Sequence, residues 1–297
     1  MKRAWIVSLI YLALPFSAQA ISLFSGNGFG ELIPPPDAGP RGMGGAGVAH
    51  RNSTASELNP ALLSSLKETT LSLTLNSELC EHEDSVRAKT SSFRLSGLRF
   101  SLPLPYRVMV GASVQRRFDM DFDIASVSGI ADTIAYTRSI AGRGGIYSTS
   151  ICLAREVFDL ISLGGSFNFL SGYGIEEWKT EFNNPEVRPA VDSLRHEYSG
   201  SNSTFGVLAR IGDAFSLGVS LTTPTTLKGE LEVLSPGGTR SEERTYRLPL
   251  TYALGAAYVR EGTLLIASGL VAYPWGNVSL NGQPRTRFSN TNRFALG

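Results

Sequence analysis

A long stretch of alternating apolar and polar side chains most limits what this chain can fold into. In residues 107–124 the even positions are apolar except Arg116, while the odd positions include Ser113, Gln115 and Asp119. Successive side chains of a β-strand point to opposite faces, so the pattern predicts one strand with an apolar face. The stretch exceeds the roughly 9 to 11 residues that a tilted strand needs to cross a bilayer. We therefore expect it to project beyond a membrane on one side.

The same alternation recurs along the chain and divides it into expected strands. We place them at residues 69–79, 91–102, 107–124, 143–154, 160–176, 201–211, 215–232, 245–260 and 263–274. The connections are alternately long, near 80–90, 125–142, 177–200, 233–244 and 275–290, and short, near 103–106, 155–159, 212–214 and 261–262. Tight turns at one end and long loops at the other are typical of outer-membrane barrels. The expected fold class is all-β, a transmembrane antiparallel β-barrel.

Composition agrees with this fold and excludes one alternative. The mean hydropathy is 0.00, with 31 glycines and 18% charged residues, as expected when lipid-facing and lumen-facing residues alternate. Beyond residue 20 the longest apolar stretch is 264–273, well short of the roughly 20 residues of a membrane helix. A helical inner-membrane protein is excluded. A soluble exported protein stays possible on composition alone, and the sorted loop lengths favour the barrel.

The N-terminus has the features of a cleaved signal peptide. Lys2 and Arg3 precede an apolar run at 4–16, and Ala18-Gln19-Ala20 supplies the small residues that signal peptidase requires. We expect the mature chain to begin at Ile21 and to reside in the outer membrane. Without Lys2 and Arg3 the chain has 25 basic and 26 acidic residues, and no basic patch indicates nucleic-acid binding.

The expected domains are a signal peptide at 1–20, an N-terminal segment at 21–66 and a barrel at 67–297. Residues 293–297 begin a tenth strand and stop without the aromatic terminal residue typical of bacterial barrels. We therefore interpret the chain as a truncated barrel with about nine to ten strands, its C-terminal strands missing. Within the second expected strand the apolar parity changes at Gly97 and Leu98, which predicts a bulge or kink.

The N-terminal segment is rich in glycine. Gly42, Gly44 and Gly47 match a dinucleotide-binding pattern, but residues 34–36 before them are prolines rather than a strand. An exported protein also meets no nucleotide pool. Close backbone packing explains these glycines better, with a flexible linker as the alternative. Further on, Asn59 and Pro60 have the composition of a helix start.

Together, R-G-M-G-G-A-G-V-A at 41–49 and N-P-A at 59–61 resemble the N-terminal region of FadL-type outer-membrane transporters of long-chain fatty acids and other hydrophobic compounds. The resemblance spans residues 38–63. It implies that this segment is a hatch inside the barrel, whose motif residues are Gly42, Gly44, Gly45, Gly47, Asn59, Pro60 and Ala61. It also implies about fourteen strands and a ligand that leaves sideways through a kinked third strand. Here the third expected strand alternates without interruption, and the break lies at Gly97 in the second.

The function that this resemblance implies is passive uptake of hydrophobic small molecules by a monomer surrounded by outer-membrane lipids and lipopolysaccharide. Relatives with the same opening include barrels that shuttle secreted proteins, and a structural or adhesive barrel is a further alternative. The inward positions that we can assign are largely Ser, Thr, Gln and Asn. They argue against a tight fatty-acid tunnel along the wall, and the ligand is left open.

We find no catalytic motif and expect no enzyme activity, cofactor or metal site. His50, His82 and His196 are far apart in sequence. Asp119, Asp121 and Asp123 share one parity, where they could bind a cation, although we favour a solvated strand projection. Cys80 and Cys152 could form a bridge in an oxidising compartment, and we favour two unpaired thiols.

Overall fold

A computed structural model describes residues 29–34, 37–51, 57–83, 87–131, 134–184, 186–235, 237–260, 264–285 and 288–297. For 78–83, 87–93, 124–127 and 131 it describes the backbone alone. The expected signal peptide and Ile21 lie outside these residues. Among the helices of the described chain, none is long and apolar enough to cross a membrane.

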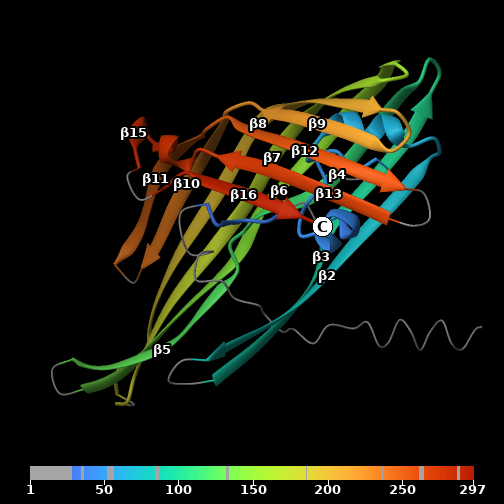
Figure 1. The fold of residues 1–297 in the computed structure, drawn as a ribbon. Helices are drawn as coiled ribbons and strands as arrows, with labels where there is room; N and C mark the ends of the chain where they lie inside the picture. The colour runs from blue at the N-terminus through green and yellow to red at the C-terminus, as the bar shows by residue number, and fades with distance from the viewer. Residues whose placement is uncertain are drawn as a thin grey trace, which may run out of the picture.

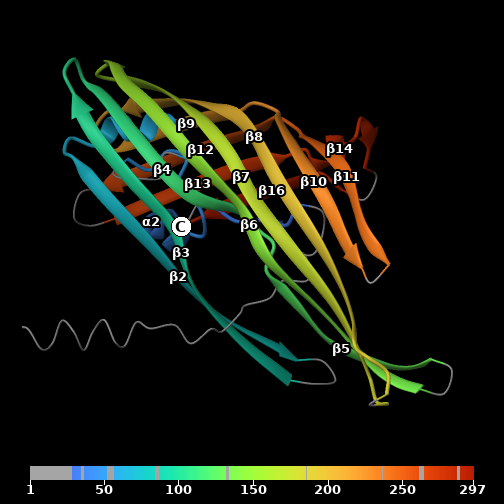
Figure 2. The same cartoon turned by 180° about the vertical axis from the view of Figure 1, so that it is seen from behind.

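The chain forms one large antiparallel sheet that curves around its N-terminal segment (Figures 1 and 2). Its strands are β1 (Glu31–Leu32), β2 (Thr70–Glu83), β3 (Arg87–Leu104), β4 (Val108–Asp119), β5 (Phe122–Ala131), β6 (Ile134–Phe158), β7 (Ile161–Phe182), β8 (Ala190–Ile211), β9 (Phe215–Thr222), β10 (Thr225–Ser235), β11 (Gly238–Leu248), β12 (Thr251–Arg260), β13 (Leu264–Tyr273), β14 (Ser279–Leu280), β15 (Gln283–Pro284) and β16 (Thr291–Leu296). Its helices are α2 (Ala38–Gly42), η2 (Pro60–Ser65) and η3 (Trp275–Asn277). The predicted all-β antiparallel fold is confirmed.

The sheet divides in two beyond β8. Residues 204–211 of β8 pair with β9, which continues to β12, β13 and β16, whereas residues 193–201 pair with β10, which continues to β11, β14 and β15. Pro224 lies between β9 and β10, and Pro249 lies between β11 and β12. Proline has no N–H for a strand ladder, which explains why the chain breaks at these positions.

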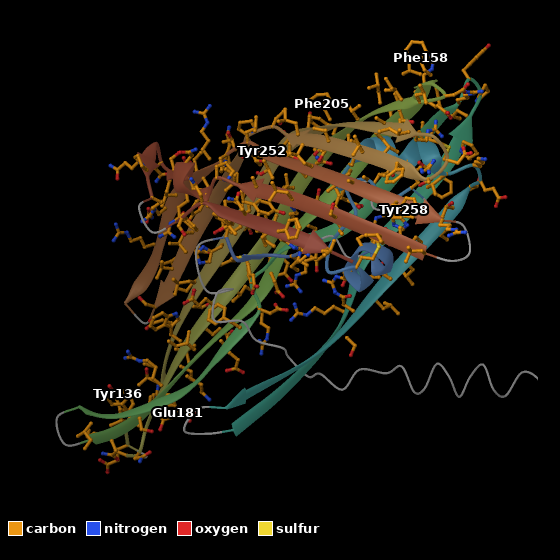
Figure 3. The ribbon with its side chains drawn as sticks, viewed as in Figure 1. Tyr136, Phe158, Glu181, Phe205, Tyr252 and Tyr258 are labelled. Carbon is orange, nitrogen blue, oxygen red and sulfur yellow. The ribbon has the colours of Figure 1, made fainter. Side chains whose placement is uncertain are left out.

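Several expected boundaries are wrong. The stretches 107–124, 215–232 and 245–260 are each divided into two strands. The long connections are largely strand as well: 125–142 belongs mostly to the β5–β6 hairpin, and 177–200 to the ends of β7 and β8. These extensions form an arm that diverges from the distal β2–β3 hairpin in both views (Figures 1 and 2). Tyr136 and Glu181 mark the far end of the arm (Figure 3).

The outer face of the sheet is apolar, as the alternation predicts. Figure 3 shows Phe158 and Phe205 pointing away from the sheet, and Phe205 is 55% exposed. The exposed outward set includes Leu73, Leu98, Ile151, Phe167, Phe169, Phe205, Val219, Leu254, Ile266 and Phe294. The inward positions between them include buried Ser113, Ser150 and Thr204. An apolar exterior around a polar wall is the arrangement of a membrane barrel.

Two β-bulges interrupt the wall near its middle. In β3, Gly97 lies opposite Thr74 and Leu95 opposite Leu75, so Ser96 is the extra residue. Leu95 and Leu98 consequently both point outward, 55% and 43% exposed. In β4 the register with β6 shifts between Arg116 and Phe118. The expectation of an uninterrupted third strand at 107–124 is therefore wrong.

Candidate functional site

The N-terminal segment packs against the inner face of the wall through Asn59. Its Nδ2 donates to Val48 O at 2.9 Å and to Val207 O at 3.1 Å, and its Oδ1 accepts from Ala61 N at 3.1 Å. Asn59 thereby caps η2 and ties the segment to itself and to β8. Pro60 begins η2, in which Ala61, Leu62 and Leu63 are buried.

Glycines of the wall allow this close approach. A Cβ on Gly164 would lie 2.4 Å from Ala61 N, and one on Gly206 would lie 2.0 Å from Asn59 Oδ1. Gly218 faces Val48 in the same way, at 2.2 Å from its carbonyl oxygen. The wall therefore has flat patches where the segment is seated, which the sequence does not reveal because glycine also marks turns and bulges.

The motif glycines of the segment have different surroundings. Gly44 and Gly45 have positive φ values of 62° and 99°, a conformation that favours glycine. A Cβ on Gly45 would lie 1.9 Å from the Arg293 guanidinium, and one on Gly47 would lie 2.7 Å from Pro40 Cγ. Gly42 ends α2 with open space around it.

A buried ion-pair group joins the segment to β3. Arg99 Nε donates to Glu57 Oε1 at 2.6 Å, and its guanidinium lies 3.7 Å from Asp37 Oδ2. The Arg99 and Glu57 side chains are each 5% exposed. Removing one member of such a group leaves an uncompensated buried charge, so these residues fix the position of the segment.

Toward the long-loop end, the interior contains an apolar and aromatic cluster of packed side chains. Its buried members are Phe29, Phe118, Met120, Ile146, Leu170, Tyr198, Leu227, Tyr246, Leu248, Val278 and Leu280. Leu32, Trp275 and Phe288 pack against them. This aromatic cluster, gathered from the N-terminal segment, six strands and the 274–288 connection, is the candidate region for contact with an apolar ligand.

Sequence reasoning missed this aromatic cluster because it placed Phe118 and Met120 on the outer apolar face. The extra residue in β4, Arg117, reverses which parity points inward, and both side chains are buried, at 2% and 6% exposed. Such a reversal is what a bulge does to a strand. The expected polar lumen is thus correct near Ser148 and Thr204 and wrong closer to the long loops.

A charged cluster lies where β3 and β4 separate. Arg94 of β3 pairs with Asp119 and lies 3.4 Å from Asp121, and Arg116 lies 2.9 Å from Asp119. Asp119 and Asp121 are 16% and 19% exposed. The expected solvated projection is therefore wrong for these two carboxylates, whereas Asp123 is exposed. Among the described residues no group of three or more His, Cys, Asp or Glu side chains is placed to hold a metal ion.

His196 and Cys152 lie apart from one another. Burial, together with the charge of Arg244, lowers the pKa of His196 to about 4, and its ring stacks on Tyr198 at 6.1 Å. Neighbouring Arg195 and Glu197 face outward and pair at 2.9 Å, which places this part of β8 beyond the apolar band. Cys152 is free and buried near Pro60, while the Cys80 side chain lies outside the described part.

A polar cavity of about 660 Å³ opens below η2 at the short-turn end. Arg107 and Arg210 line it and both pair with Glu156. Arg51 of the N-terminal segment and Lys67, which follows that segment, also line it. The interior is therefore apolar toward the long loops and charged at the short turns, with the segment between the two.

Comparison with solved structures identifies the fold. The alignment with a Pseudomonas aeruginosa FadL homologue covers 90% of this chain and 77% of the homologue, with 15% sequence identity and a TM-score of 0.62. The alignment with the Ralstonia pickettii toluene transporter TbuX covers 89% of this chain and 78% of TbuX, with 13% identity and a TM-score of 0.53. The alignment with the TodX deltaS2S3 mutant, a monoaromatic hydrocarbon channel, covers 87% of this chain and 75% of the mutant, with 14% identity and a TM-score of 0.52. The chain has the FadL-type fold.

Sequence comparison supplies the family. No curated protein sequence matches the chain. The model of the BamG family matches residues 1–234, most of the chain. The chain therefore belongs to the BamG family.

Proposed function

We propose that this protein resides in the outer membrane and passes small hydrophobic molecules across it. The observation that carries the proposal is the apolar and aromatic cluster inside a sheet whose outer face is itself apolar. Contact with such side chains removes an apolar solute from water, and passage requires no covalent chemistry. The likeness to a FadL homologue and to toluene transporters agrees with this role.

The outward apolar band has the height of a bilayer. In β7 it runs from Ile161 to Tyr173, which at about 3.3 Å per residue and a tilt of about 45° spans roughly 28 Å. Exposed Glu177 continues the same face above the band. In this orientation the short turns lie in the periplasm and the arm of β5 to β8 projects from the cell.

For the route, we propose lateral exit beside β4. Pairing with β3 ends at Gln115, and beyond it β1 is paired to β4 through Glu31 and Leu32. The bulge at Arg117 and the end of β4 at Asp119 interrupt the third long strand. Beyond Gln115, β4 has no pairing with β3, so movement of β1 away from β4 would give an apolar solute access to the bilayer.

We further propose that residues 21–66 act as a hatch, with Asn59, Pro60 and Ala61 as its anchor. The hydrogen bond from Asn59 to Val207 and the close packing of the segment on Gly164 and Gly206 support this role. The cargo class comprises long-chain fatty acids or smaller hydrocarbons. Outer-membrane lipids and lipopolysaccharide would surround the apolar band of a monomer.

Uptake into cells tests the function. A strain without its own hydrophobic carrier, expressing this chain, should accumulate labelled oleate or toluene faster than the same strain with an empty vector. Outer-membrane fractionation and faster gel migration of the unheated protein provide the control for folding. Folded barrel in the outer membrane with no gain for either solute would contradict the transport proposal.

The projecting arm favours a second candidate, a barrel that binds a secreted protein. Its strands carry exposed side chains, among them Arg138, Lys179 and Glu181, and Figure 3 shows Glu181 at the far end of the arm. Replacing residues 125–139 and 176–194 by short Gly-Ser turns separates the two candidates. Loss of surface-exported protein with unchanged uptake would support the binding role.

A further inference from the structure

The polar cavity below η2, which we call the short-turn cavity, is separate from the aromatic cluster and shares no residue with it. Phe158 and Tyr258 lie at the same end of the sheet (Figure 3). A volume of about 660 Å³ is within the range of sites that hold small organic molecules. One side of the cavity is made by residues 51 and 64–67, and the other by β3, β4, β6, β8, β12 and the turns between them. A molecule in it would therefore contact both the N-terminal segment and the wall.

Two cations line this cavity without a carboxylate partner. Arg51 Nη2 donates to the backbone carbonyl of Asp213, which holds the guanidinium in place without neutralising its charge. Among the described residues, none bonds or pairs with the exposed Lys67 ammonium. An anion that entered the cavity would meet two positive charges that no carboxylate of the chain already occupies.

The arginines of the wall are paired, and one of them leaves a donor unused. Arg107 Nη1 lies 2.6 Å from Asp159 Oδ1, and Arg210 pairs with Glu156 through Nη2. Arg210 Nε is buried and has no acceptor in the described part of the chain. A buried donor is destabilising unless an acceptor or a water fills the space beside it. In all, the cavity is lined by four cations, Arg51, Lys67, Arg107 and Arg210, and three carboxylates, Glu156, Asp159 and Asp213.

The remainder of the lining is largely apolar. It consists of Leu66, Pro103, Leu104, Val108, Met109 and Val259, with the hydroxyl groups of Ser64 and Ser65. An inorganic anion would use the charges and leave this surface wet, whereas a hydrocarbon would leave the cations without a counter-charge. The net charge of one positive and the apolar surface together match an organic monoanion that has an apolar part.

We propose that the short-turn cavity is a binding site for a small amphiphilic monoanion, such as a medium-chain carboxylate. Its oxyanion is held by Arg51, Lys67 and Arg210 Nε, and its alkyl part lies against the apolar lining. Because these cations come from both sides of the cavity, the bound anion joins the N-terminal segment to β8. The inference goes beyond the proposed transport function, since the site lies apart from the aromatic cluster and selects for charge.

Three probes separate charge from apolar contact. In lipid nanodiscs, equilibrium dialysis of labelled octanoate at neutral pH, where its carboxyl group is ionised, should show one saturable site per chain after subtraction of protein-free discs. Octan-1-ol has the same chain without the charge, and acetate has the charge without the chain. Each should bind at least about tenfold more weakly than octanoate.

Matched variants locate the site. Arg51→Gln with Lys67→Gln should weaken octanoate binding at least about tenfold, because two charged donors are lost. Arg138→Gln with Lys179→Gln removes one arginine and one lysine from the arm and should bind within about twofold of the parent, since distant exposed charges are screened. Arg210→Lys keeps the charge beside Glu156 but lacks Nε, and should weaken binding about threefold or more.

Unchanged octanoate affinity in the Arg51→Gln, Lys67→Gln variant would overturn the proposal, and so would equal saturable binding of octan-1-ol. Faster gel migration of the unheated protein shows that each variant is folded. If the double variant does not fold, Lys67→Gln alone takes its place, because this exposed side chain has no partner to lose, and it should weaken binding about threefold.

The outcome is separable from that of the uptake experiment. Octanoate binding that depends on Arg51 and Lys67, without uptake of oleate or toluene, would support this site and contradict transport. Uptake with no such binding would leave transport standing and overturn the site.

Discussion

Close packing between wall glycines and the N-terminal segment is the feature that single residues control most directly. Gly164 and Gly165 are neighbours in β7 and face opposite sides of the sheet. A Cβ on Gly164 would lie 2.4 Å from Ala61 N and Pro60 C, whereas one on Gly165 would first meet the Phe205 ring at 3.8 Å. A methyl group therefore does not fit at Gly164, whereas at Gly165 it would lie at an ordinary van der Waals distance from its nearest neighbour.

We therefore predict that Gly164→Ala displaces η2 from the wall and lowers the free energy of unfolding by about 1–3 kcal/mol, the usual cost of overpacking. Gly165→Ala should lie within about 0.5 kcal/mol of the parent. Urea unfolding of the refolded barrel measures both. A Gly164→Ala barrel as stable as Gly165→Ala would show that the segment is not seated on this glycine.

His196 makes stability depend on pH. Its pKa is lowered to about 4 in the folded state, against about 6.5 in the unfolded chain. Below pH 6.5 the unfolded state takes up a proton that the folded state resists, so stability falls as pH drops from 6.5 to 4 and levels off below 4. His196→Phe keeps a ring beside Tyr198 and removes the titration. Its melting temperature should fall less than that of the parent across this window, and equal slopes would contradict the assignment.

At the scale of elements, the bulge in β4 decides both what faces inward and where β3 departs. Deleting Arg117, the unpaired residue of the register shift, keeps Phe118 and Met120 inside and straightens the strand. We expect the variant to fold and to bind toluene as the parent does, but to take up toluene several-fold more slowly, because the opening beside β4 closes. Uptake per folded barrel is the measurement. Undiminished uptake would exclude this exit.

The elements also show how far sequence reasoning reaches. Alternation predicts outward faces well, since Leu73, Phe167 and Val219 all lie on the exposed apolar surface. It fails where one extra residue changes which alternate positions point inward. Nothing in the sequence marks Arg117 as unpaired, and a phenylalanine at 118 suits either the outer apolar face or the interior. It also fails at the loops, since polar strands beyond a membrane lose the apolar face by which strands are recognised.

Over the whole molecule, the position of the apolar band predicts where charge is tolerated. Phe205 and Val191 both point outward from β8, Phe205 within the band and Val191, which pairs with Lys179, above it. Phe205→Arg should cost about 2–4 kcal/mol in lipid, the value for arginine near the midplane, and Val191→Arg about 0–1 kcal/mol. Folding titrations in vesicles measure the difference. Equal costs would mean that the band does not lie in the bilayer.

Contacts of the N-terminal segment join residues far apart in the sequence, and this separation limits the order in which the protein can assemble. Asn59 finds an acceptor at Val207, and Gly44 accepts from Arg293, 249 residues later. The N-terminal segment pairs with Arg99 of β3 but acquires its remaining partners only when β8 and β16 have formed, and contacts of such sequence separation form slowly. Until then, the segment lacks these two contacts. A composition of Gly, Pro and small side chains, which resists premature secondary structure, keeps it available for that late step.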